Sequence, residues 1–68
     1  MKSTYDEPVL TPREREILKK IGEGKTSKQI AMALHLSVLT VANHRKHICR
    51  KLGLHSTAEL VVYAAVRE

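Results

Sequence analysis

The sequence predicts an all-α domain, a four-helix bundle in which the second and third helices form a helix-turn-helix. Three observations predict this fold class. Helix-start signals recur four times, and glycines or short polar segments lie between them. No run of alternating β-branched residues predicts a strand, and both prolines lie within the first 12 residues. A chain of 68 residues can bury one hydrophobic core but not two.

The first helix is predicted over residues 12–22. Residues 11–14 (TPRE) place a capping hydroxyl before the helix, a proline at its first position and a glutamate at its third. Gly22 and Gly24 follow as stop signals. Three apolar residues share one side of this helix and are expected to face the core: Ile17, Leu18 and Ile21.

A short second helix is predicted over residues 27–34, because residues 26–29 (TSKQ) repeat the capping pattern. Its expected inward residues are Ile30, Ala31 and Leu34. Only His35 and Leu36 separate this helix from the next capping residue, so the two helices must cross sharply. We expect His35 to adopt the left-handed conformation, which histidine tolerates better than most residues. A short helix, a tight turn and a longer basic helix make a helix-turn-helix pattern.

The third helix is predicted over residues 38–52, between a Ser37 cap and Gly53. Thr40 does not complete a capping box with Ser37. The apolar side is expected to hold Val38, Val41, Ile48 and Leu52. The opposite side holds Ala42, Asn43, Lys46 and Arg50, with Arg45 at its flank.

The fourth helix is predicted over residues 57–67, with a capping box in residues 56–59 (STAE). It is apolar almost all round, whereas a surface helix of a small monomer keeps a polar stripe. Leu60, Val61 and Ala64 are expected to face the core. Val62 and Val66 then form an exposed apolar stripe, with Ala58 and Tyr63 nearby, which indicates a partner. The alternative is a fraying C-terminal helix with ordinary exposed aliphatic side chains.

The charge is concentrated in the middle of the chain. Twelve Lys and Arg residues against seven Asp and Glu give a formal charge of +5. Residues 24–58 contain basic side chains and no carboxylate, which is typical of a surface that faces a polyanion. The only aromatic residues are two tyrosines, so the stacking platform that holds single strands is missing, and duplex is the expected target.

The third helix carries side chains suited to the edges of base pairs. Asn43 can pair with adenine and Lys46 can donate to guanine, and residues three apart share one helix face. Ala42 could touch a thymine methyl or simply allow close approach. The hydroxyl and basic side chains around them suit phosphate oxygens. The alternative is an amphipathic helix with a solvated basic face.

Several segments closely resemble the LuxR/NarL/FixJ-type DNA-binding domain, over residues 9 to about 66. These are residues 10–16 (LTPRERE), 24–31 (GKTSKQIA), 36–38 (LSV) and 51–53 (KLG), with Thr40, Val41, His44 and Ile48. The resemblance implies a four-helix domain that binds duplex DNA as a homodimer through its fourth helix and controls transcription. It also implies an N-terminal receiver or sensor domain in the full-length protein, which would be a response regulator of a two-component system.

The resemblance also implies roles for individual residues. The family's base-reading positions correspond to Ala42, Asn43 and Lys46. Its backbone-contacting positions correspond to Thr26, Lys28, Thr40, His44, Arg45 and Lys51, and Arg50 on the same helix is expected to join them. Two positions depart from the family pattern. Ala42 cannot hydrogen-bond a base, and Leu39 stands where a charged or polar residue is common, so the target sequence stays open.

Other functions find no support in the sequence. His44, His47 and Cys49 lack the spacing of a metal site, so we expect no metal, no cofactor and no enzyme activity. Cys49 is expected to be a small, partly buried residue. The apolar run Leu60 to Val66 is too short to cross a membrane. One cysteine allows no internal disulfide, which favours a cytoplasmic protein.

Two alternative functions stay open at this point. One is a sigma-factor-like promoter-reading domain, which shares a similar helix-turn-helix. The other is a protein-interaction module whose basic surface docks an acidic partner. The segment 51–53 and the apolar fourth helix favour a regulator domain over the first alternative. We expect residues 1–9 to be a linker or tail and residues 10–68 to be the DNA-binding domain, excised from a longer regulator or free-standing.

Overall fold

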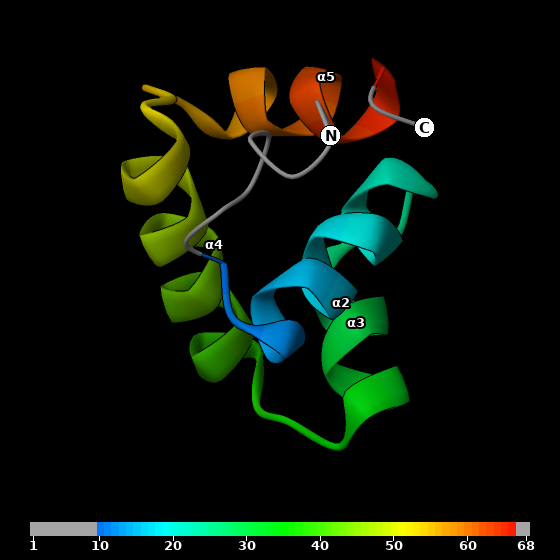
Figure 1. The fold of residues 1–68 in the computed structure, drawn as a ribbon. Helices are drawn as coiled ribbons and strands as arrows, with labels where there is room; N and C mark the ends of the chain where they lie inside the picture. The colour runs from blue at the N-terminus through cyan, green and yellow to red at the C-terminus, as the bar shows by residue number, and fades with distance from the viewer. Residues whose placement is uncertain (1–9, 67–68) are drawn as a thin grey trace.

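The computed structural model describes residues 10–66 (Figure 1). The described part holds four helices and no strand: α2 over Pro12–Gly22, α3 over Ser27–Leu34, α4 over Val38–Leu52 and α5 over Thr57–Val66. The predicted all-α class and all four helices are confirmed. The predicted linker and the last predicted residue of the fourth helix lie outside the described residues.

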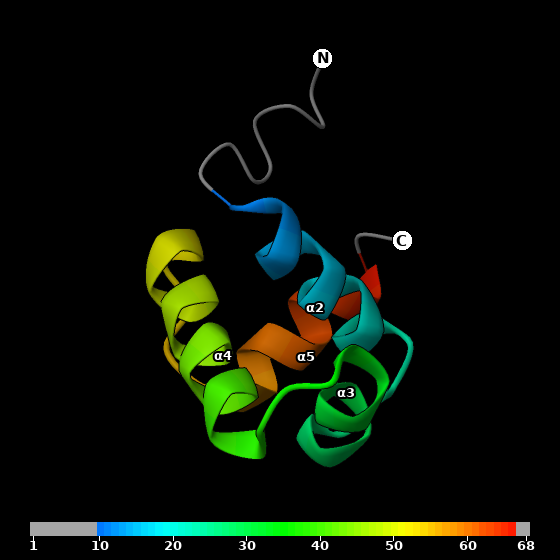
Figure 2. The ribbon, with the colours of Figure 1, turned by 90° about the horizontal axis from the view of Figure 1, so that it is seen from below.

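The helices pack around α2, which contacts the other three. α5 packs mainly on α2 and lies across one end of the molecule, and the α3–α4 turn lies at the other end (Figure 1). Seen from below, α3 and α4 lie on either side of their short connection, and α4 runs along one edge of the bundle (Figure 2). The arrangement therefore leaves one long side of α4 uncovered by the other three helices.

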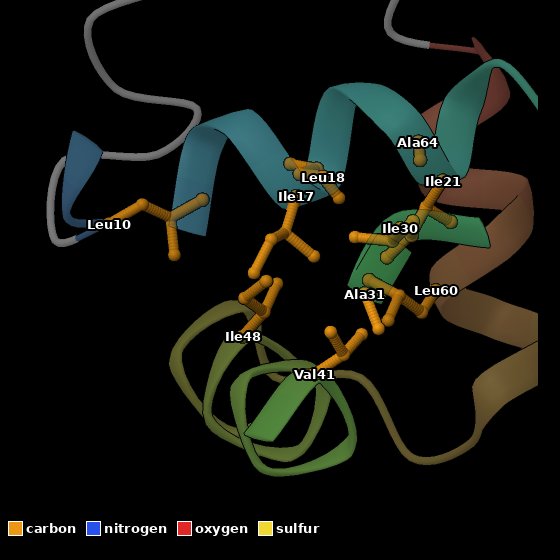
Figure 3. Packing of buried hydrophobic residues seen from close by; sticks show 10 residues of the cluster. All are labelled: Leu10, Ile17, Leu18, Ile21, Ile30, Ala31, Val41, Ile48, Leu60 and Ala64. Carbon is orange, nitrogen blue, oxygen red and sulfur yellow. The ribbon is translucent and has the colours of Figure 1, made fainter. Parts of the chain in front are cut away.

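A single core joins all four helices. Side chains from α2 point toward those of α3, α4 and α5 (Figure 3). The buried apolar residues are Leu10, Ile17, Leu18, Ile21, Ile30, Ala31, Val41, Ile48, Leu60 and Ala64. Leu34 and Leu52 are half-buried and pack against this cluster. The predicted inward residues of α2 and α3 are thereby confirmed.

Two predicted core residues are exposed instead. Val38 is 49% exposed and Val61 is 41% exposed. Val38 is the first residue of α4 and lies at the margin of the stripe set by Val41 and Ile48. On α5 the buried line runs through residues 60 and 64, so Val61 is rotated about 100° away from the core.

The helix ends follow the predicted turn chemistry. His35 has φ 59° and ψ 42°, which confirms the left-handed conformation predicted for it. The amide of Leu36 donates to the Ala31 carbonyl at 2.9 Å, which closes the end of α3. Gly24 and Gly53 have positive φ after α2 and α4, so the same type of termination recurs. The α3–α4 angle is therefore set by a three-residue connection with one left-handed residue.

The helix starts differ in one detail from the prediction. Both threonine capping boxes form, at the starts of α2 and α3, and Ser37 caps α4 without a box, as expected. At α5, Ser56 Oγ accepts the Glu59 amide at 3.1 Å. The Glu59 carboxylate, however, accepts the amide of His55 at 2.7 Å, one residue before the expected Ser56 partner.

Candidate nucleic-acid interface

The exposed side of α4 is fixed by what its other side buries. Val41 and Ile48 are fully buried. They are two turns apart, so they hold one side of the helix against the core and turn the opposite side outward. Asn43, Lys46 and Arg50 are exposed on that outward side. The predicted polar face of the third helix is therefore a surface that a large partner can reach.

A groove of about 610 Å³ runs beside α4 and gathers four of the predicted DNA-contacting residues. Its lining includes Ala42, Arg45, Lys46 and Arg50. Ser27 of α3, Cys49 of α4 and residues 54–57 at the start of α5 complete the lining. Within the part of the chain that the structure describes, this lining includes three cationic side chains and no carboxylate. Such a concave cationic surface attracts a polyanion.

The remaining predicted contacts on α3 and at the start of α4 lie apart from that lining. Thr26 caps α3, and its Oγ1 accepts the Gln29 amide at 3.1 Å. Lys28 is exposed in the first turn of α3. Thr40 is half-buried, and its Oγ1 accepts the hydroxyl of Ser37 at 2.9 Å. Thr26 therefore already caps α3, whereas the cap of α4 is Ser37, to which the Thr40 hydroxyl is hydrogen-bonded.

Lys51 lies on a different side of α4, where it meets a buried carboxylate of α2. Its Nζ is 2.8 Å from Glu14 Oε1, and the Glu14 residue is only 4% exposed. The same Oε1 accepts the Thr11 amide at 2.9 Å. This ion pair ties the start of α2 to the end of α4 across 37 residues of sequence. It is the main polar contact that sequence reasoning missed.

The environment of Glu14 favours its ionised form. Burial raises the pKa of its carboxyl, but hydrogen bonds from Lys51 and Thr11 and electrostatic interactions with Lys51 and His44 outweigh burial. The pKa of Glu14 is therefore lower than its ordinary value. A signal for burial was present in the sequence, because residue 14 lies three and four residues before Ile17 and Leu18 and so shares their face.

His44 is a predicted backbone-contacting residue of α4 that lies neither in the lining of the cationic groove nor in the Glu14–Lys51 pair. It is half-buried, and its Nδ1 is buried without a hydrogen-bond partner among the described residues. Only Nε2 is left to meet a ligand at the surface. His44 therefore packs against the domain on one side and offers one ring nitrogen on the other.

A second, apolar groove lies on α5. It has a volume of about 370 Å³, and Ala58, Val62 and Tyr63 line it together with Leu54 and Glu59. Val66 follows on the same helix and is 75% exposed. The structure therefore brings three of the four predicted dimer residues together and leaves the fourth beside them.

Cys49 lies on α4, in the lining of the cationic groove. Cys49 is half-buried, and burial raises the pKa of its thiol, a shift that Arg45 opposes and Glu59 supports. Across residues 10–66, no group of three His, Cys, Asp or Glu side chains could hold a metal ion. None of the described helices combines the length and the apolar character needed to cross a bilayer.

Comparison with known proteins gives one family match. The model of the luxR family of bacterial regulatory proteins matches residues 8–64. The uncharacterized response regulatory protein YgeK of Escherichia coli K12 is 54% identical over 52 residues, which are 76% of this chain and 35% of that protein. No solved structure matches the chain.

Two further relatives carry regulatory names. The oxygen regulatory protein NreC of Staphylococcus aureus is 52% identical over 56 residues, 82% of this chain and 26% of that protein. The transcriptional regulatory protein MctR of Rhizobium johnstonii is 47% identical over 55 residues, 81% of this chain and 26% of that protein. The matched part of this chain thus corresponds to about a quarter to a third of the length of these relatives.

Proposed function

Because the chain belongs to the luxR family of bacterial regulatory proteins, which are DNA-binding transcription regulators, we propose that it reads a specific duplex sequence with α4 in the major groove. The observation that carries this proposal is the exposed polar face of α4, held outward by Val41 and Ile48 on its buried side. α3 lies beside it as the first helix of the motif, which in this geometry crosses the DNA backbone.

The proposed base contacts are Asn43 and Lys46, with Ala42 allowing close approach. All three are exposed on α4, and the two polar side chains share its outward face. An asparagine pairs with adenine through two hydrogen bonds, and a lysine donates to the acceptors of guanine in the major groove. A site containing both bases is therefore expected.

The proposed phosphate contacts surround these base readers. Arg45 and Arg50 line the cationic groove with Lys46, and Lys28 extends the positive surface onto α3. The other proposed contacts are Thr26, Thr40, His44 and Lys51. Lys51 also forms the ion pair with Glu14, so a phosphate contact by this residue would be additional to that pair. Phosphate contacts of this kind position the helix without reading sequence.

We further propose that two copies associate through α5. Ala58, Val62 and Tyr63 line an apolar groove, and Val66 extends it with an exposed valine. A two-fold dimer would place two α4 helices at half-sites about one turn, roughly 10 base pairs, apart. The family match favours this regulator function over the sigma-factor-like alternative.

The whole protein is proposed to be a cytoplasmic response regulator, without enzyme activity in this domain, in which an N-terminal receiver or sensor domain controls the DNA-binding part. The support is the response-regulator name of one relative and the small share of each relative that this chain covers.

Selection of bound duplexes from a random library, followed by sequencing, tests this function. The expected result is an enriched two-fold motif with half-sites about 10 base pairs apart. Enrichment of a motif without two-fold symmetry would refute the dimer and keep specific reading. Equal binding of every duplex, at protein concentrations that saturate the library, would refute specific reading. The polar side of α4 would then be a solvated basic face that reads no sequence.

A further inference from the structure

One residue on the outward face of α4 has no place in the polar contacts described above. Leu39 is the second residue of α4 and is 71% exposed. It lies four residues before Asn43 and seven before Lys46, so the three side chains share one face. A large hydrocarbon side chain therefore stands in the surface that we propose enters the major groove.

Its position at the beginning of the helix is the second part of the argument. In a helix-turn-helix the N-terminal residues of the recognition helix are those that approach base edges. Leu39 is followed one turn later by Ala42, which is also exposed and apolar. Neither side chain can donate or accept a hydrogen bond, so neither can use the polar atoms of the groove.

The major groove offers one apolar group, which is the C5-methyl of thymine. We propose that Leu39, supported by Ala42, contacts a pyrimidine C5-methyl in each half-site and so makes the domain prefer thymine at that position. This inference rests on the proposed function and adds the chemistry of one base contact. The same methyl group occurs in 5-methylcytosine, which is the other source of this chemistry.

A protein partner is the competing occupant. Met32 and Val38 are also exposed, at 70% and 49%, and could belong to an apolar docking surface around the α3–α4 connection. DNA is favoured because Leu39 shares its face with Lys46 and Arg50, and because no carboxylate occurs between residues 24 and 58. An apolar residue within a cationic face suits a duplex that offers both phosphates and methyl groups.

The test uses the duplex recovered by selection and removes one methyl group at a time. Each thymine of a half-site is replaced by uracil, which keeps every hydrogen bond and lacks only the methyl. The dissociation constant is then measured for the unchanged chain and for Leu39→Ala. Met32→Ala is the matched control, since it truncates an equally exposed apolar side chain on α3. Circular dichroism confirms that each variant is folded.

We expect one thymine position at which uracil weakens binding about fourfold, the factor for burial of one methyl-sized group. Leu39→Ala should weaken binding to the thymine site and abolish the thymine–uracil difference, whereas Met32→Ala should preserve it. Combining the base change with the Leu39→Ala substitution makes a double-mutant cycle. The cycle isolates the contact, because it measures the effect of the methyl group on affinity with and without the Leu39 side chain. Replacing that base pair with one containing cytosine or 5-methylcytosine then shows which methylated pyrimidine binds more tightly.

Three results would overturn the inference. If every uracil-substituted site binds as tightly as the thymine site, no methyl is read, while specific DNA binding stands. If a difference persists in Leu39→Ala, another residue reads the methyl. If selection recovers no sequence at all, the proposed function fails and this inference falls with it.

Discussion

At the residue scale, Glu14 is the side chain with the clearest energetic role. It is buried beside Lys51 and accepts a hydrogen bond from the Thr11 amide through the same oxygen. A buried carboxylate is costly unless it is paired and hydrogen-bonded, and here both conditions hold. The pair connects the first helix of the domain with the end of the proposed recognition helix.

Replacement of this carboxylate should lower stability in a pH-dependent way. Glu14→Gln keeps an oxygen for the Thr11 amide but loses the charge opposite Lys51, and we expect a loss of about 1–2 kcal/mol at pH 7. The folded-state pKa of Glu14 is depressed. Its stabilisation is therefore present above the unfolded-state pKa and is lost as pH falls through the folded-state pKa.

Urea unfolding of both chains between pH 7 and pH 3 measures this effect. The difference between the chain and Glu14→Gln should shrink as the pH falls. Glu16→Gln is the matched control, because the Glu16–Arg13 pair is solvent-exposed and 3.4 Å long, and its loss should cost under about 1 kcal/mol. Equal losses for the two variants would show that the buried pair contributes no more than a surface pair.

At the element scale, the contact between α2 and α5 depends on Gly22. A Cβ added at this residue would lie 2.7 Å from the Ala64 carbonyl oxygen, which is backbone and cannot rotate away. Helix propensity alone would favour alanine over glycine by up to about 1 kcal/mol. The close approach to Ala64 predicts instead that alanine at residue 22 lowers the stability of the domain.

Gly22→Ala is therefore expected to destabilise the domain by about 1–3 kcal/mol, as overpacking does. Thermal unfolding followed by circular dichroism measures it. Gly24 provides the comparison: a Cβ there meets no atom, and its positive φ of 88° is the only obstacle. Gly24→Asn should consequently lower the stability of the domain less than Gly24→Ala does, because asparagine tolerates the left-handed region better than alanine. A stabilised Gly22→Ala variant would refute the close packing.

The exposed apolar stripe of α5, formed by Val62 and Val66, can be tested by its effect on assembly on DNA. Val62 is 60% exposed and lines the apolar groove of this helix. Val62→Asp places a charge where we propose a second α5, so cooperative binding to a two-fold site should be lost. Affinity for an isolated half-site should stay the same, because α4 is untouched.

Titration of full sites and half-sites in one assay separates the two effects. The unchanged chain should bind the full site with a cooperativity that Val62→Asp lacks. Unaltered cooperativity in a folded Val62→Asp variant would place the interface elsewhere. A parallel loss on the half-site would mean that the substitution damages the domain itself.

At the scale of the whole molecule, local chemistry accounts for what the sequence could predict. Capping residues, glycine stops and apolar spacing act within a turn or two, and they determine the bounds of all four helices and the left-handed His35. The outward face of α4 follows from the same periodicity, since Val41 and Ile48 fix its buried side.

Contacts between distant segments could not be predicted in the same way. The Glu14–Lys51 pair joins residues 37 apart, and no local pattern links them. Val38 and Val61 lie at the edge of their apolar stripes, and the sequence did not show on which side of that edge the packing would leave them. The bases that α4 reads belong to the DNA, so side-chain chemistry predicts their types while their order must be measured.

The central claim is that α4 reads bases, and a comparison of two lysines tests it most directly. Lys46 is exposed on α4, and Lys19 is exposed on α2, outside the proposed interface. Dissociation constants are measured for Lys46→Ala and Lys19→Ala on the selected duplex and on a shuffled duplex at one salt concentration. We predict that Lys46→Ala weakens binding to the selected duplex by roughly 1–3 kcal/mol, about 5- to 150-fold, and to the shuffled duplex far less. Lys19→Ala should change the dissociation constant for neither duplex strongly. Equal losses on both duplexes, or equal losses for both lysines, would contradict base reading by α4.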